Sequence, residues 1–254
     1  MPRLLLLDAK YENPIELTSK LETYLKKHKI KSVAIFASTQ FTNLNNLISQ
    51  LKKLKIKPLI TKAKRTSDKI QILGCDCYND SFQQNTIEKA DLILYIGDGL
   101  FHPKALLLAQ KNNKKTKQVL MFNPIADKLT LINNKIINDQ LKKAKRNLKF
   151  FLNAETIGIL VTIKPGQQFL NQAIKLKEHL EKQNKKAYIF IDNTLDINQL
   201  ENYPFIQAWV NTACPRIGTD DITNIKEPMI NIREASNPIK ALEALENDSK
   251  SKKH

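Results

Sequence analysis

Short apolar segments alternate with longer amphipathic segments along most of this chain, and that alternation limits the folds open to it. The first kind reads as buried strands, and the second places leucines three or four positions apart, as helices do. The expected strands span 3–10, 31–38, 57–61, 69–74, 90–99, 117–124, 156–166, 186–192, 204–215 and 227–232. The expected helices span 13–30, 41–56, 102–111, 135–154, 167–185 and 196–203. This order predicts an α/β fold with parallel sheets, in which ligands bind beyond the carboxyl ends of the strands.

The pattern restarts midway, which indicates an internal repeat. Residues 33–56 read as strand, turn and amphipathic helix, and residues 157–180 repeat that order with one residue of slack in the turn. We therefore expect two similar domains, each a small parallel sheet with flanking helices, and a site in the cleft between them. The expected boundaries are 1–124 for the first domain, 125–245 for a linker helix plus the second, and 246–254 for a polar tail that frays.

The first helix carries recognisable start signals. Asn13 is a favoured N-cap residue, and Pro14 suits the first turn because its missing N–H would have no partner there. A helix that starts at this point places Leu17, Leu21 and Leu25 on one buried face.

The chain is strongly basic, with a formal net charge of +16. Nucleic-acid binding is one explanation of such a charge. The lysines, however, are spread along the helices, and no RNA-binding motif with interleaved aromatic residues is present. We therefore do not expect direct nucleic-acid binding; a basic surface would equally suit a ribosome-associated protein.

The distribution of apolar residues argues against a membrane protein. No apolar run approaches the roughly 20 residues that cross a bilayer. The four leucines at 4–7 are too few for a signal-peptide core and are followed at once by Asp8. We therefore place the chain in the cytoplasm, where cysteines remain thiols.

Three cysteines, Cys75, Cys77 and Cys214, are too few for a disulfide framework and are either buried filler or metal ligands. On an extended strand Cys75 and Cys77 would point the same way. Their spacing is shorter than that of zinc sites, and no second tight pair exists, so we do not expect structural zinc. An iron–sulfur cluster takes cysteines from separate segments, although composition alone does not lead to one.

Two glycine turns follow expected strands. In "GDGLFHP", Gly97 and Gly99 precede a helix expected to open at Pro103, which is typical of an anion cradle but also of an ordinary turn. His102 could be a ligand, a base or a capping group. In "TIKPGQ", Lys164 and Gly166 could hold a carboxylate or phosphate, or could form an ordinary turn.

The densest polar cluster is "ACPRIGTDD", where Cys214 ends an expected strand. A stiffening Pro215 and an arginine, Arg216, follow it, and two adjacent acids, Asp220 and Asp221, close the cluster. The arginine and an acid could serve a ligand, or could simply pair with each other.

These motifs, in this order, resemble the archaeal diphthamide synthase family, also called 2-(3-amino-3-carboxypropyl)histidine synthase. The residues that carry the resemblance are "LGCDCYN", "GDGLFHPKALLLA", "TIKPGQ", "NYPFIQAWVNTACPRIGTDD" and "EPMINIREA", and it extends over about residues 4–236. It implies three similar α/β domains, each of which contributes one cysteine to a 4Fe-4S cluster. The cluster binds S-adenosylmethionine, and an electron from it releases a 3-amino-3-carboxypropyl radical that adds to a histidine of translation elongation factor 2.

The resemblance also assigns roles to residues. Cys75 matches the second cluster cysteine and Cys214 the third, while Cys77 is extra and could be a replacement ligand. It implies that the cleft is lined by residues that bind the cofactor or co-substrate: Gly97, Gly99, His102, Lys164 and Gly166. It implies a catalytic group made of Arg216, Asp220 and Asp221, in which the acids orient the arginine or hold the substrate's ammonium group.

The chain departs from the family in lacking the first domain and its cysteine. Three readings follow: part of a split enzyme completed by a second chain or by a homo-oligomer, a non-catalytic partner subunit, or a degenerate paralog. Two cysteines would leave a cluster exposed, so we favour the split enzyme, which also needs an electron donor. The rivals from other classes are a basic binding module without a cluster and a transferase that binds phosphate with its glycine turns.

Overall fold

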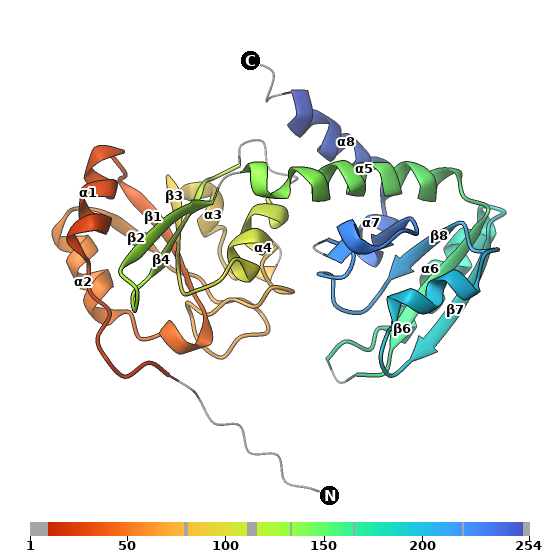
Figure 1. The fold of residues 1–254 in the computed structure, drawn as a ribbon, viewed down its shortest axis with the longest axis horizontal. Helices are drawn as coiled ribbons and strands as arrows, with labels where there is room; N and C mark the ends of the chain where they lie inside the picture. Colours follow the sequence, from red (N-terminus) through yellow and green to blue (C-terminus); the bar gives the residue numbers. More distant parts are fainter. Residues whose placement is uncertain are drawn as a thin grey trace, which may run out of the picture. The chain divides into compact units, whose positions relative to one another are not determined.

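The computed structural model describes residues 10–78, 81–110, 116–132, 134–164, 166–219 and 221–250 (Figure 1). The chain divides into two compact units, Met1–Ile136 (unit 1) and Ile137–His254 (unit 2). The expected strand at 3–10 lies almost wholly outside the described residues. The α/β class and the two units, each with a largely parallel sheet and flanking helices, are as predicted.

Unit 1 is built on a five-stranded sheet of order β2-β1-β3-β4-β5. Its strands are β1 (Ser32–Ala37), β2 (Lys57–Leu59), β3 (Leu92–Ile96), β4 (Val119–Asn123) and β5 (Lys128–Ile132). The first four are mutually parallel, and β5 is antiparallel to β4. Every residue of β3 is buried, as expected for a parallel strand covered on both faces.

The strand β5 was not predicted, because residues 125–155 read as a linker. Asn123 makes the connection: its Oδ1 accepts the N–H groups of Ile125 at 3.0 Å and Ala126 at 3.1 Å. Asp127 then adopts a φ of 43°, which completes a tight turn back along β4. The hairpin therefore belongs to unit 1, and the linker begins later than expected.

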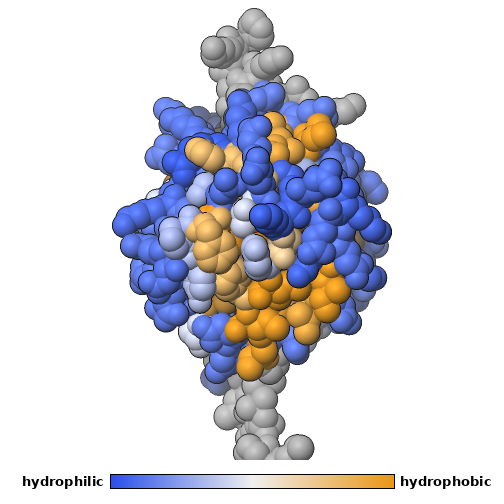
Figure 2. Space-filling view, turned by 90° about the vertical axis from the view of Figure 1, so that its right-hand side faces the viewer, coloured by the Kyte–Doolittle hydropathy of each residue, from blue (hydrophilic) through white to orange (hydrophobic). Residues whose placement is uncertain are grey.

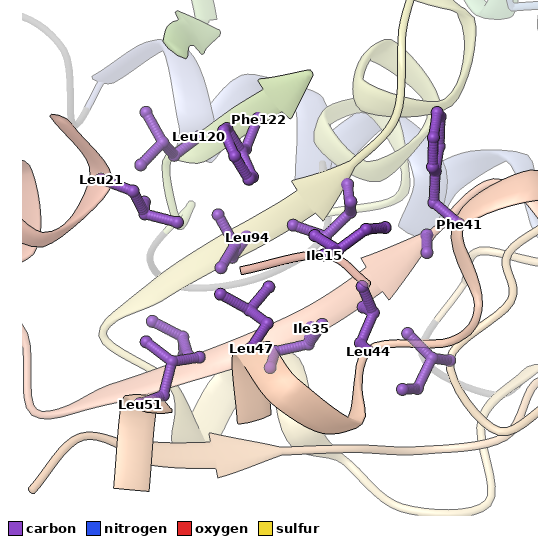
Figure 3. Packing of buried hydrophobic residues seen from close by; sticks show 14 of the residues in the cluster. Ile15, Leu21, Ile35, Phe41, Leu44, Leu47, Leu51, Leu94, Leu120 and Phe122 are labelled. Carbon is purple, nitrogen blue, oxygen red and sulfur yellow. The ribbon is translucent and has the colours of Figure 1, made fainter. Parts of the chain in front are cut away.

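The helices of unit 1 cover both faces of the sheet: α1 (Ser19–Lys27), α2 (Asn45–Lys53), α3 (Thr86–Lys89) and α4 (Phe101–Ala109). Figure 3 shows leucines of α1 and α2, such as Leu21 and Leu47, packing with Ile35 of β1 and Leu94 of β3. The alternate strand residues, Tyr95 among them, are buried on the opposite face.

The first helix begins later than its sequence signals suggest. Thr18, not Asn13, is the N-cap, and its Oγ1 accepts the N–H of Leu21 at 3.4 Å. The preceding residue, Leu17, is tied instead to α2, because its N–H donates to Gln50 Oε1 at 2.6 Å. This tertiary hydrogen bond outweighs the local capping signal.

Unit 2 contains a four-stranded parallel sheet of order β7-β6-β8-β9. Its strands are β6 (Thr156–Thr162), β7 (Lys186–Asp192), β8 (Ala208–Asn211) and β9 (Met229–Asn231). Its helices are α5 (Asn138–Asn153), α6 (Leu170–Lys182), α7 (Ile232–Ala235) and α8 (Pro238–Lys250), with short 3-10 turns η4 (Ile197–Asn202) and η5 (Asp221–Asn224). The 3-10 turn η3 (Asn134–Ile137) spans the boundary between the two units. The helix α8 continues to Lys250 and so extends into the segment 246–254 that was expected to be a polar tail.

A glycine allows β6 and β8 to pack closely. Gly158 and Trp209 are cross-strand neighbours, and a Cβ at Gly158 would lie 2.4 Å from the Trp209 ring. Trp209 is 1% exposed and packs with Phe190 of β7 at 4.9 Å between ring centroids.

No helix among the described segments combines the length and the apolar character needed to span a bilayer.

Candidate functional site

In unit 1, Cys75 lies at the carboxyl edge of the sheet. Residues 69–74 do not form the expected strand, since only Gln71 pairs, as an isolated bridge, with Ala37 at the end of β1. Two backbone hydrogen bonds, Ala37 N–H to Ile70 O at 3.0 Å and Ile72 N–H to Ala37 O at 3.1 Å, fix that bridge. Because β3 is parallel to β1, its following turn at Gly97 lies at the same edge, where α/β proteins bind ligands.

The surroundings of Cys75 include two residues that sequence reasoning missed. Arg65 donates from Nη1 to Cys75 Sγ at 3.5 Å. Asp76 is buried, and its Oδ2 accepts the backbone N–H of Arg65 at 2.6 Å. Thus a guanidinium group lies against a half-buried thiol, and a neighbouring carboxylate fixes the loop that carries it.

Cys77 is placed differently from Cys75. It is 2% exposed, and its Sγ lies 3.3 Å from Gly74 O and 3.5 Å from Ala105 O of α4. Its thiol is therefore engaged by backbone carbonyls in the interior of unit 1. This placement favours a packing role over that of a replacement cluster ligand.

The turn after β3 needs glycine at both predicted positions. Gly97 has a φ of 156°, and a Cβ there would lie 2.6 Å from Tyr95 Oη; Gly99 has a φ of 66°. The helix α4 then opens at Phe101 rather than Pro103, with Leu100 as N-cap. The turn thus lets the Tyr95 hydroxyl reach the first turn of α4.

His102 is anchored by that hydroxyl. Tyr95 Oη lies 3.1 Å from His102 Nδ1. Burial raises the pKa of Tyr95 to about 12, so the phenol keeps its proton at neutral pH and can donate. The pair fixes the orientation of the imidazole.

In unit 2, Lys164 and Gly166 follow β6, and Cys214 and Arg216 follow β8. The two strands are parallel neighbours, so all four residues lie at the same sheet edge. The backbone N–H of Lys164 donates to Thr162 Oγ1 at 3.2 Å, its side chain is exposed, and Gly166 has a φ of 75°. The Lys164 ammonium group is thus open to a ligand.

Two buried asparagines, missed from the sequence, fix the loop of Cys214. Asn211 Nδ2 donates to Cys214 O at 2.8 Å and to Asn231 Oδ1 at 2.7 Å. Asn231 Nδ2 donates in turn to Pro215 O at 3.0 Å. A Cβ at Gly218 would lie 2.4 Å from Asn231 Oδ1, so the loop closes tightly over this pair. The only signal in the sequence is an asparagine at the end of each of two apolar strands.

Arg216 is 5% exposed. Its backbone carbonyl accepts the N–H of Thr219 at 3.2 Å, which closes the turn. Asp220 lies outside the described residues, and so does the side chain of Asp221, the first residue of η5. Pairing between Arg216 and either acid stays a prediction.

Each unit thus presents one half-exposed cysteine thiol at the carboxyl edge of its sheet. Within the described residues of either unit, no group of three or more His, Cys, Asp and Glu side chains is gathered for a metal ion. Thiolates from separate segments are the usual ligands of iron–sulfur clusters, so the donor atoms fit such a cofactor. The convergence of Cys75 and Cys214 in one cleft stays a prediction, since they belong to different units.

A separate cavity of about 120 Å³ lies in unit 2, between its sheet and η4, and is lined by apolar and aromatic residues such as Leu160, Phe190 and Tyr203. None of the predicted site residues lines it. The face of the molecule drawn in Figure 2 also carries an apolar patch among hydrophilic residues.

Known proteins resemble this chain across both units. Residues 8–248 match the family described as "Putative diphthamide synthesis protein". The 2-(3-amino-3-carboxypropyl)histidine synthase of Pyrococcus horikoshii is 30% identical over 164 residues, which cover 65% of this chain and 44% of the relative. The synthase of the same name from Methanocaldococcus jannaschii is 28% identical over 223 residues, which cover 84% and 54%.

The fold is similar to that of a crystal structure of Dph2 from Pyrococcus horikoshii with a 4Fe-4S cluster, with a TM-score of 0.63 and 23% identity over 91% of this chain and 63% of that chain. The chain spans about half the length of the curated relatives it matches. The family match covers nearly all of the sequence and includes both cysteine-bearing sheet edges. This chain therefore belongs to the diphthamide synthesis family.

Proposed function

We propose that this chain takes part in the first step of diphthamide biosynthesis, the transfer of a 3-amino-3-carboxypropyl group from S-adenosylmethionine to a histidine of translation elongation factor 2. It acts as one part of a split or heteromeric enzyme in a reducing compartment such as the cytoplasm. The observation that carries the proposal is the half-exposed thiol at the carboxyl edge of the sheet in each unit, in a chain of this family.

Cys75 and Cys214 would hold a 4Fe-4S cluster. When bound, the cluster would supply the electron that cleaves the sulfonium bond to the 3-amino-3-carboxypropyl group. The protein's part is to fix the sulfurs: Asn211 and Asn231 hold the loop of Cys214, and Asp76 holds the loop that faces Cys75.

Charged groups at the same edges would orient the co-substrate. Lys164 would meet its carboxylate, since the lysine is exposed beside the turn of Gly166. Arg216, with Asp220 and Asp221, would hold the amino-acid end. The glycine turn at Gly97 and Gly99 would let backbone approach the ligand, with His102 held beside it by Tyr95.

A further ligand must come from elsewhere if the cluster is to keep one open iron for substrate. Two cysteines satisfy only two of the three positions that such a cluster offers to protein. We propose that a second chain supplies the third cysteine, and that the same assembly receives electrons from a separate donor. A homo-oligomer would instead bring a second copy of Cys75 or Cys214.

Anaerobic reconstitution with iron and sulfide tests the proposal. The chain, alone or mixed with a partner encoded in the same genome, should turn brown and retain stoichiometric iron and sulfide after desalting. Cys75→Ala and Cys214→Ala should each abolish uptake, whereas Cys77→Ala, the matched control, should retain it. Colour that survives loss of both ligands would contradict the assignment. Absence of uptake with every partner would favour a subunit or binding module without a cluster.

A further inference from the structure

Arg65 is built into unit 1 as a cation beside a cluster cysteine, a role that the sequence motifs do not assign. Its guanidinium Nη1 lies 3.5 Å from Cys75 Sγ. An arginine presents its donors in a rigid planar fork and stays charged at any pH that a protein survives. In this structure the sulfur therefore faces a positive charge and an N–H donor.

The loop that carries Arg65 is fixed on both sides. The flanking Ala63 pairs with Phe82 as an isolated bridge, and the N–H of Lys64 donates to Ser81 O at 2.9 Å. Thr66 Oγ1 donates back to Ala63 O at 3.1 Å. Together with the bond from Asp76 to the Arg65 backbone, these contacts fix the backbone from which the Arg65 side chain reaches Cys75.

We propose that Arg65 is a positioning residue that holds the Cys75 sulfur and makes a cluster bound there easier to reduce. The inference rests on the proposed function. One-electron reduction takes a 4Fe-4S cluster from the 2+ to the 1+ state, with the electron coming from the reductant. The reduced form carries more negative charge, so a nearby cation and an N–H···S bond stabilise it more than the oxidised form.

The test is a redox titration of the reconstituted protein, assembled with its partner chain where uptake requires one. Dithionite and mediators set the potential, and electron paramagnetic resonance measures the reduced cluster. Arg65→Gln should lower the ratio of reduced to oxidised cluster at a fixed potential by about threefold to tenfold. The expected effect is no larger because solvent screens the charge of the exposed guanidinium. Arg65→Lys, which keeps the charge, should recover most of the loss.

Lys64→Gln is the matched control, because it removes one positive charge from the neighbouring position of the same loop. Its ratio should stay within about twofold of the unmodified protein, as expected for a screened surface charge. Arg65→Gln should still fold, because Asp76 binds the backbone N–H of residue 65, and glutamine keeps that N–H.

Two results would overturn the inference without touching the proposed function: an Arg65→Gln cluster with an unchanged ratio, or equal effects of Arg65→Gln and Lys64→Gln. Failure of the unmodified chain to take up iron and sulfide with any partner would overturn the proposed function, and this inference with it. Loss of uptake in Arg65→Gln, with uptake and ratio recovered in Arg65→Lys, would support the positioning role.

Discussion

Replacing Asn231 with alanine should lower the free energy of unfolding, because it removes hydrogen bonds that hold the loop of Cys214. The substitution removes two hydrogen bonds, Asn231 Nδ2 to Pro215 O at 3.0 Å and Asn211 Nδ2 to Asn231 Oδ1 at 2.7 Å. Neither partner is left without a bond, since Asn211 still donates to Cys214 O and Pro215 O still accepts from Thr219 Oγ1 at 3.1 Å. At about 1 kcal/mol net for each lost bond, the free energy of unfolding should fall by about 2 kcal/mol.

Trp209 is the chain's single tryptophan and lies in the core of unit 2, so its fluorescence reports the unfolding of that unit. Urea denaturation followed at this signal should show the loss as a lower midpoint with an unchanged slope. Asn153→Ala is the control, because Asn153 is an exposed asparagine whose side chain bonds locally, to Lys149 O at 2.8 Å. It should cost less than about 0.5 kcal/mol, as surface substitutions do. Equal effects of the two substitutions would refute the idea that Asn231 fixes the loop.

Three further predictions concern other parts of the molecule. Gly158→Val should destabilise unit 2 by about 1–3 kcal/mol, because its side chain would overlap the Trp209 ring; an unchanged urea midpoint would contradict this. Thr18→Ala should cost about 1 kcal/mol through loss of the α1 cap, measured by thermal melting, and wild-type melting would place the cap elsewhere. Folding should weaken as pH rises from 10.0 toward about 12, because Tyr95 resists ionisation only in the folded state, and Tyr95→Phe should flatten that part of the stability profile.

The periodicity of the sequence identified the elements that carry long buried apolar runs. Strands such as Leu92–Ile96 and Thr156–Thr162 are buried on both faces. A strand of this kind is a nearly continuous apolar run, which is easily recognised in the sequence. The edge strand Lys128–Ile132 was not predicted, because it is half exposed and its position depends on a turn that the Asn123 side chain stabilises. Likewise the start of α1 depends on Gln50, which lies 33 positions away in the chain.

The candidate site shows the same division. Cys75, Gly97 and Cys214 could be placed at the sheet edges because each follows an apolar segment. The residues that contact them, such as Arg65 and Asn231, come from other segments. A hydrogen bond between distant segments cannot be predicted from the local sequence pattern.

The unequal placement of two neighbouring thiols has a practical consequence for handling the protein in air. Cys77 is buried, with its sulfur in contact with two backbone carbonyls, while Cys75 is half exposed beside a guanidinium group. A Cys75–Cys77 disulfide would require the buried sulfur to leave the core, so in this pair brief aerobic exposure should oxidise Cys75 rather than Cys77, to a sulfenic acid that thiols reverse. Mild reductant should then restore the Cys75 thiol without unfolding, and the number of thiols titrated in the folded protein before and after such treatment would follow the recovery.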